Sequence, residues 1–296
     1  MNKFSDKNIA LLKITAAMFI FGTIGIFVCH IGLPSGFLAF ARGIMGSVFL
    51  LAITLFSKKK LSFASIKKNL ILLIVSGVFI GINWILLFEA YRFTTVASAT
   101  LCYYLSPVFV IIASPFVLRE KMTIKKALCV FSALLGIVFV SGVIEEGVGD
   151  LKGLLLGVGA AVFYACVVLL NKHLKDISSY DMTVVQLAAA AITILPYTLL
   201  TEDISADVFD ATAIVMLIIV GTVHTGLAYV LYFGSIKDLP AQTAAIFSYI
   251  DPVVAIILSA LFLSEPLSPL GIVGAVLVLG STLICELPSK KQSSAL

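Results

Sequence analysis

Long apolar runs separated by short polar connections cover almost the whole chain. Each run has about twenty residues, and a helix of that length spans the roughly 30 Å of hydrocarbon in a bilayer. The pattern predicts an all-α integral membrane protein with ten transmembrane helices. The approximate limits of these helices are residues 10–29, 35–57, 69–91, 95–117, 124–144, 151–171, 181–200, 211–235, 240–263 and 267–286.

One part of this pattern occurs twice. In an ungapped comparison of Tyr104–Glu120 with Tyr249–Glu265, eight of seventeen positions are identical. The offset of 145 residues is close to half of the 296-residue chain, which indicates two copies of one unit. We expect residues 1–145 to form a first five-helix repeat and residues 146–296 a second one.

Basic residues are unevenly distributed over the connections. Seventeen of the twenty fall on one predicted side of the membrane, and the exceptions are Arg42, Arg92 and Lys152. Positively charged loops stay in the cytoplasm, so both termini are expected there, in a bacterial inner membrane, with the acidic connections 145–150 and 201–210 outside. Five helices in each half then force the second repeat to enter the membrane upside down. This inverted repeat is the usual basis of alternating access.

Composition supports the membrane assignment. The chain is 60% hydrophobic and only 12% charged, whereas a soluble domain is about half apolar and about a quarter charged. Its five cysteines occur singly, and no nucleotide-binding or zinc-protease motif is present. We therefore expect no metal, no cofactor and no nucleic acid, and the predicted partners are the lipid bilayer and a small-molecule substrate.

Two prolines interrupt predicted helices at matching positions of the repeat. Pro107 and Pro252 each lack an amide hydrogen, which frees the carbonyl groups of Tyr103 and Ser248 four residues earlier. A free carbonyl is costly in lipid unless it lines a cavity or finds another partner. The prolines therefore indicate either kinks that shape the bundle or helix breaks that face a central substrate cavity.

Asp251 precedes the second proline near the centre of the ninth predicted helix, and Ser106 is its counterpart in the first repeat. A carboxylate at mid-membrane is costly unless it is paired, protonated or hydrated. At helical spacing it shares a small polar face with Ser248, and Ser106 shares one with Tyr103. We expect Asp251 to bind a cation, an ammonium group or a proton in a cavity; the alternative is a structural hydrogen bond to a neighbouring helix.

Other polar residues are further candidates for coupling or binding. His224 lies near the centre of the eighth predicted helix and is either a proton carrier or a buried polar contact. Glu89 and Arg92, three residues apart, either neutralise each other or form an outer gate or zwitterion-binding spot. Arg42 either extends to the outer headgroups or binds a substrate carboxylate.

Aromatic residues lie deeper in the predicted helices than an interfacial belt would. Trp84 and Tyr229 are related by the 145-residue offset, and Asn83 stands beside the tryptophan. Aromatic belts form at the membrane interfaces, and an amide that faces lipid is penalised. These residues therefore favour an aromatic wall around a cavity over a lipid-facing belt.

Each copy of the repeat has an alanine-rich run, a mid-helix proline, a leucine-rich end and a glutamate, at Ala97–Glu120 and Gln242–Glu265. These features resemble the EamA-type branch of the drug/metabolite transporter superfamily, and Arg42 resembles the arginine typical near the start of that family's second helix. The resemblance covers residues 10–286. It implies two inverted five-helix bundles, a cavity lined mainly by the third, fourth, eighth and ninth helices, and export of amino acids, related metabolites or drugs. Asp251 departs from the family's commoner uncharged residue at its position.

We therefore expect a secondary transporter, not an enzyme. It moves small metabolites, amino acids or related compounds, outward by alternating access through a central cavity, with protons as a candidate coupling ion. The alternative from another class is a membrane-embedded enzyme that modifies lipids, which needs a polar catalytic cluster at the interface. A sensory membrane protein needs a soluble output domain, and no connection in the sequence is long enough to hold one.

Overall fold

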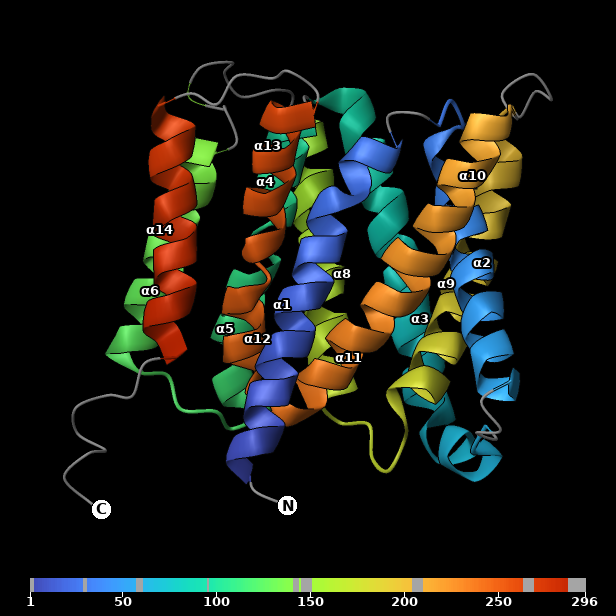
Figure 1. Cartoon of the computed structure of the whole chain (residues 1–296), viewed down its shortest axis with the longest axis horizontal. Coiled ribbons are helices and arrows are strands. Elements are labelled where there is room, and N and C mark those ends of the chain that lie inside the picture. Colours follow the sequence, from blue (N-terminus) through green and yellow to red (C-terminus); the bar gives the residue numbers. More distant parts are fainter. Residues whose placement is uncertain are drawn as a thin grey trace.

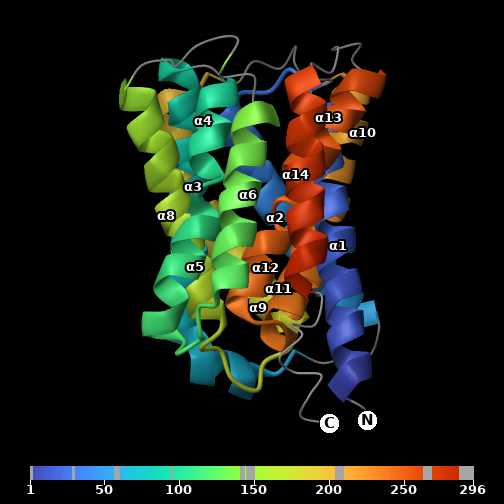
Figure 2. The same cartoon turned by 90° about the vertical axis from the view of Figure 1, so that its left-hand side faces the viewer.

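The computed structural model describes residues 3–28, 31–56, 61–94, 96–140, 144, 151–203, 210–262 and 269–286, which form helices and connections without any strand. The helices stand side by side, and α1 begins on the same side of the bundle on which α14 ends (Figure 1, Figure 2). The predicted all-α class is confirmed. The boundary between residues 145 and 146, the acidic connection 145–150 and Glu265 lie outside the described residues.

The helices follow the apolar runs. In the first half they are α1 (Lys3–Val28), α2 (Ser35–Phe56), α3 (Phe63–Phe93), α4 (Val96–Tyr103), α5 (Ser106–Val117) and α6 (Ile124–Val140). In the second half they are α8 (Leu151–Asn171), α9 (Ser179–Thr201), α10 (Ala211–Ile219), the π-helical segment η2 (Val220–Leu227), α11 (Ala228–Asp238), α12 (Ala241–Phe247), α13 (Ile250–Phe262) and α14 (Pro269–Glu286).

Six helices among the described residues are long and apolar enough to cross a bilayer: α1, α2, α3, α8, α9 and the stretch from Ala211 to Asp238. Large apolar side chains cover the outside of the bundle; Phe56 is 88% exposed and Phe116 is 84% exposed. Lipid can solvate such faces, and a helix satisfies its own backbone groups where no water is present. The protein is therefore a multi-pass membrane protein.

Two helices are interrupted. The first break falls at Tyr104 and Leu105, between α4 and α5, and the second at Ser248 and Tyr249, between α12 and α13. At each break one amide bonds to the carbonyl three residues earlier, at 3.1 and 3.2 Å, which tightens the helix end. In Figure 1 the chain descends from α4 to α5 and rises from α12 to α13.

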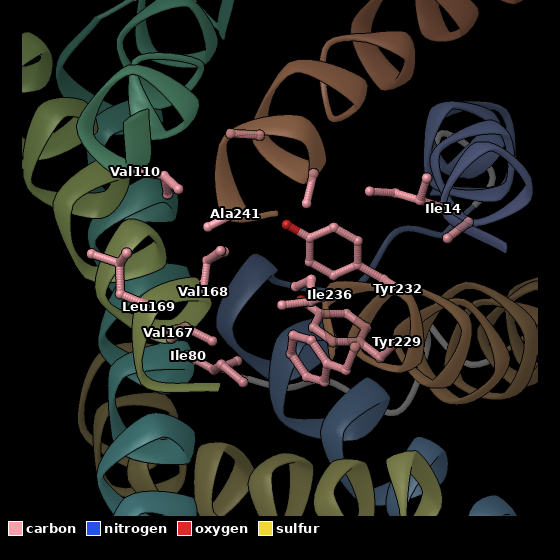
Figure 3. Packing of buried hydrophobic residues seen from close by; sticks show 14 of the residues in the cluster. Ile14, Ile80, Val110, Val167, Val168, Leu169, Tyr229, Tyr232, Ile236 and Ala241 are labelled. Carbon is pink, nitrogen blue, oxygen red and sulfur yellow. The ribbon is translucent and has the colours of Figure 1, made fainter. Parts of the chain in front are cut away.

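The two halves pack against each other in matching pairs. α3 packs on α8 and α11 packs on α1, while α3 meets α9 and η2 meets α2. α6 and α14, which also correspond in sequence, pack together at one edge (Figure 2). The core therefore lies between the halves. Figure 3 shows side chains of this core from six helices: Ile14, Ile80, Val110, Val168, Tyr232 and Ala241.

A polar cluster and a glycine bring three of these helices together. The side-chain amide of Gln186 on α9 donates to Asn171 Oδ1 on α8 at 2.6 Å and to Ser76 Oγ on α3 at 2.9 Å. One residue along α3, a Cβ at Gly77 would lie 2.6 Å from the Gln186 carbonyl oxygen. Small residues allow such close approach, and buried polar groups hydrogen-bond across helices in lipid.

Candidate functional site

A small cavity lies where the two helix breaks meet α1 and α8. Its volume is about 40 Å³, and a single water needs about 10–15 Å³ by the same measure, so the cavity can hold a few waters. It is lined by residues from both halves of the chain: Met18, Phe21, Tyr103, Tyr104, Ser106, Pro107, Tyr164, Ser248 and Asp251.

The prolines explain why the breaks occur here. Pro107 lies in the first turn of α5 and Pro252 in the first turn of α13, where a missing amide costs nothing. The preceding half-helix cannot continue because the carbonyls of Tyr103 and Ser248 have no amide four residues later. Each interruption exposes polar backbone, and a cavity is one place where such backbone is tolerated in a membrane.

Asp251 is the charged residue of the cavity lining. It lies in the first turn of α13, where the positive end of the helix dipole favours a carboxylate. α1 approaches this turn closely, because a Cβ at Gly22 would lie 2.7 Å from the Asp251 carbonyl oxygen. Within the part of the chain that the structure describes, no basic side chain forms an ion pair with Asp251. The structure thus places Asp251 in a cavity, as predicted, and its binding role stays a prediction.

Aromatic rings form the rest of the cavity wall and extend beyond it. The ring of Tyr103 lies 5.9 Å from Tyr104 and 5.7 Å from Tyr164, measured between centroids. Tyr164 stacks on Tyr232 at 6.3 Å, and Phe21 contacts Tyr232 at the same distance. These contacts join the cavity to the buried core of α11.

Arg42 lies at the far end of this aromatic group. Its guanidinium carbon is 4.7 Å from the centre of the Trp84 ring, and Trp84 packs edge-on against Tyr229 at 6.1 Å. Tyr229 in turn contacts Phe21 of the cavity wall at 5.3 Å. The Arg42 Nε atom donates to Thr225 Oγ1 at 3.1 Å, and among the described residues no carboxylate pairs with it. Arg42 therefore lies beside the cavity rather than in its lining.

His224 is buried in η2 and faces α1. Its Nε2 atom lies 2.8 Å from Thr23 Oγ1, whose single hydrogen goes to the Ile20 carbonyl at 2.7 Å, so the histidine is the donor. Its ring also packs on Phe27 at 4.8 Å. These contacts are those of a polar link between helices, and His224 does not line the cavity.

Asn83 and Glu89 are also directed away from the cavity. The side-chain amide of Asn83 donates to the Ala160 carbonyl on α8 at 2.7 Å. Glu89 accepts from Arg92 at 2.8 Å and from the Tyr197 hydroxyl at one end of α3. Arg92 is largely exposed there. The structure thus brings Tyr103, Ser106, Ser248 and Asp251 together around the cavity. Asn83, Glu89 and Arg92 lie outside this group.

Sequence reasoning missed the contributions of α1 and α8 to the cavity. Met18, Phe21 and Tyr164 carry no proline, charge or repeat signal that separates them from other apolar residues. It also missed the π-helical segment η2. The sequence signal for this segment is its run of weak helix formers, with glycine or threonine at positions 221, 222, 225 and 226.

Comparison with known proteins identifies the family. The model of the EamA-like transporter family matches residues 8–142 and 151–286. This chain belongs to the EamA-like transporter family. The predicted resemblance is therefore confirmed, and the protein is a membrane transporter for a small-molecule substrate.

Relatives agree with this assignment. The transporter YxxF of Bacillus subtilis (strain 168), whose name describes it as uncharacterized, is 32% identical over 266 residues, 87% of this chain and 83% of YxxF. YoaV of the same organism, named in the same way, is 26% identical over 241 residues, 80% and 82% of the two chains. A crystal structure matches this protein with a TM-score of 0.82 over 94% of this chain and 98% of its own, at 19% identity, which shows the fold alone.

Proposed function

We propose that this transporter exports small metabolites, amino acids or related compounds, by alternating access through the cavity at the two helix breaks. The observation that carries this proposal is the carboxylate of Asp251 in that cavity, without a basic partner among the described residues. Broken helices near the bilayer midplane are where transporters with internal repeats bind substrates and ions.

The proposed mechanism includes an inverted repeat, which two features of the packing support. The interrupted helix of the first half runs through Figure 1 in the direction opposite to its counterpart in the second half. The packing of α3 on α8 has its counterpart in that of α11 on α1. We propose ten membrane crossings, in which α4 with α5, α10 with η2 and α11, and α12 with α13 each form one. Residues 1–145 and 146–296 are then the two repeats.

Asp251 is proposed to bind either a proton or the cationic group of the substrate. A substrate ammonium would neutralise the carboxylate, and a substrate carboxylate could reach Arg42 past Trp84 and Tyr229. An amino acid carries both groups. The cavity as it stands has room for only a few waters, so a metabolite requires the helices around the breaks to move.

The proposed orientation puts both termini in the cytoplasm, in a bacterial inner membrane. In Figure 1, α3 and α6 begin and α8 ends on the side on which α1 begins. Lys67, Lys126 and Lys172 belong to these helix ends, in accord with the positive-inside rule. In a variant without the five native cysteines, Lys67→Cys and Asp203→Cys should react with an impermeant reagent from opposite sides. Reaction of both from outside intact cells would contradict the orientation.

Flux measured in liposomes that contain only the purified protein tests the proposed function. Counterflow of a labelled amino acid, with a panel of unlabelled compounds as competitors, should reveal substrate-dependent exchange. Empty liposomes are the control. If the protein moves no compound of the panel but the liposome lipids are chemically modified, the result would instead support the alternative of a lipid-modifying enzyme. Within the described residues we find no cluster of metal-binding side chains that would serve such an enzyme.

A further inference from the structure

We propose that Glu120 is a gating residue, whose carboxylate closes the cavity toward the side on which the chain begins by holding the N-terminus of α12. The inference rests on the proposed alternating access. It concerns a residue outside the cavity, in the connection between α5 and α6. Its basis is a set of contacts that join the two interrupted helices on the side on which the chain begins.

The central contact is a carboxylate at a helix N-terminus. Glu120 Oε1 accepts the amide of Ala241 at 2.7 Å, and Oε2 accepts the amide of Gln242 at 3.2 Å. These are the first two residues of α12, whose amides have no partner inside the helix. A charged acceptor at this position complements the helix dipole, and the bond to Ala241 has the length of a charge-assisted hydrogen bond. The loop of the first half thereby holds a half-helix of the second.

The backbone before Glu120 is shaped for this contact. α5 ends at Val117, and Arg119 adopts a left-handed conformation with φ 57°, one of two residues other than glycine with positive φ among the described residues. The Glu120 amide then bonds back to the Ser114 carbonyl at 3.4 Å. A left-handed residue with a Cβ is strained, and such strain persists where the surrounding contacts stabilise it. Here the turn directs Glu120 to α12.

Three side chains extend the same junction. The Gln242 side chain donates to Ser114 Oγ on α5 at 2.6 Å, and Lys126 on α6 donates to Gln242 Oε1 at 2.7 Å. Lys172, just after α8, donates to the Leu239 carbonyl at 2.5 Å, immediately before the start of α12. α5, α6 and α8 are therefore all joined to the beginning of α12.

The opposite side of the cavity lacks such a junction in the part of the chain that the structure describes. α5 and α12 pack closely, whereas α4 and α13, the other halves of the same helices, do not. Figure 1 places α5 and α12 toward the chain termini and α4 and α13 toward the other side. Since Ser106 begins α5 and Ser248 follows α12, the closed pair lies directly below the cavity. Opening on that side requires the Glu120 carboxylate to release both amides.

Cysteine labelling tests this gate without requiring transport. In a variant without native cysteines, Ser106→Cys reports access to the cavity, and a small maleimide is added to membrane vesicles of each orientation. Glu120→Gln should raise the labelling rate from the N-terminal side by about threefold to tenfold, because a neutral acceptor forms hydrogen bonds roughly half as strong. Unchanged labelling from that side in the Glu120→Gln variant would overturn the proposal.

Glu202 provides a matched control. Its carboxylate also accepts two backbone amides, those of Gly36 and Phe37, both at 2.7 Å, at the N-terminus of the uninterrupted helix α2. Glu202→Gln should leave labelling from the N-terminal side at the parent rate. An equal increase in both variants would mean general loosening of the bundle and would also overturn the gate.

Two substitutions of Arg119, which remove the same charge, separate the effect of the backbone conformation of the loop from the effect of that charge. Arg119→Gly keeps the left-handed turn and should label at the parent rate, whereas the β-branched Arg119→Val should label as fast as Glu120→Gln. Equal rates for both Arg119 variants would contradict the role of the turn.

Transport and labelling together distinguish failure of the gate from failure of the proposed function. If the parent protein transports a compound while Glu120→Gln labels at the parent rate, only the proposed gate is contradicted. If no compound is transported while labelling changes as expected, the proposed function fails instead.

Discussion

The first helix break leads into α5 through Ser106, whereas the second leads into α13 through a first turn that carries Asp251. Both breaks come after a half-helix, both are followed by a proline, and both line the same cavity. The backbone arrangement is thus present twice and the charge once. In the proposed mechanism, the duplicated scaffold supplies the two breaks and Asp251, in one copy, supplies the binding chemistry.

The largest expected effect comes from removing this difference. Asp251→Ser gives both breaks the same residue type, and transport should fall by about 10-fold to 100-fold, because a hydrogen bond to a charged group contributes roughly 1.5–3 kcal/mol. Ser106→Ala should lower transport by no more than about fivefold, since a neutral bond contributes about 1 kcal/mol or less. Initial rates of uptake into proteoliposomes measure both. Equal losses in the two variants would show that the breaks are functionally equivalent.

The helices packed on the two breaks provide the next comparison. A Cβ at Gly22 on α1 would lie 2.7 Å from the Asp251 carbonyl oxygen, and one at Gly157 on α8 would lie 2.9 Å from the Ala99 carbonyl oxygen. Each change to alanine should lower the free energy of unfolding by about 1–3 kcal/mol through overpacking. Thermal unfolding in detergent measures this loss. Only Gly22→Ala should also reduce transport beyond the loss of folded protein, because it displaces α1 from the turn that holds Asp251.

Replacing the two prolines is expected to have the smallest effect on transport. Pro107→Ala and Pro252→Ala each restore one amide that can bond the carbonyl four residues earlier. Because one such bond contributes roughly 1 kcal/mol, each change should slow transport by about fivefold or less as the break closes. Pro252→Ala should have the greater effect, since Asp251 adjoins it. A faster Pro252→Ala variant would argue that the prolines only shape the bundle.

The positions of both breaks could be predicted from the sequence because proline has no backbone amide hydrogen. The repeat places such a residue at matching positions in its two copies. The sequence also singled out Tyr103, Ser106, Ser248 and Asp251, which the structure places around one cavity and whose roles remain predictions. Phe21 and Tyr164 complete the wall, but an aromatic residue in an apolar helix looks the same whether it faces lipid, core or cavity.

Residues whose side chains point away from the cavity show what the pattern along a single helix cannot predict. Asn83 was grouped with Trp84 because the two are adjacent, yet neighbours on a helix point about 100° apart. Its amide bonds to the backbone of α8, while Trp84 contacts Arg42. The direction of a polar side chain depends on which helix packs against it, and that requires the tertiary structure.

The most direct test of the role of the second break compares two kinds of flux in the Asp251→Asn variant, which keeps the size of the side chain and removes its charge. If Asp251 carries the proton, transport driven by a pH gradient should be lost while exchange of substrate for substrate continues. If Asp251 binds the cationic group of the substrate, apparent affinity should fall in both assays. Normal transport by the variant between about pH 5 and pH 8 would contradict the account and would leave Asp251 a structural group.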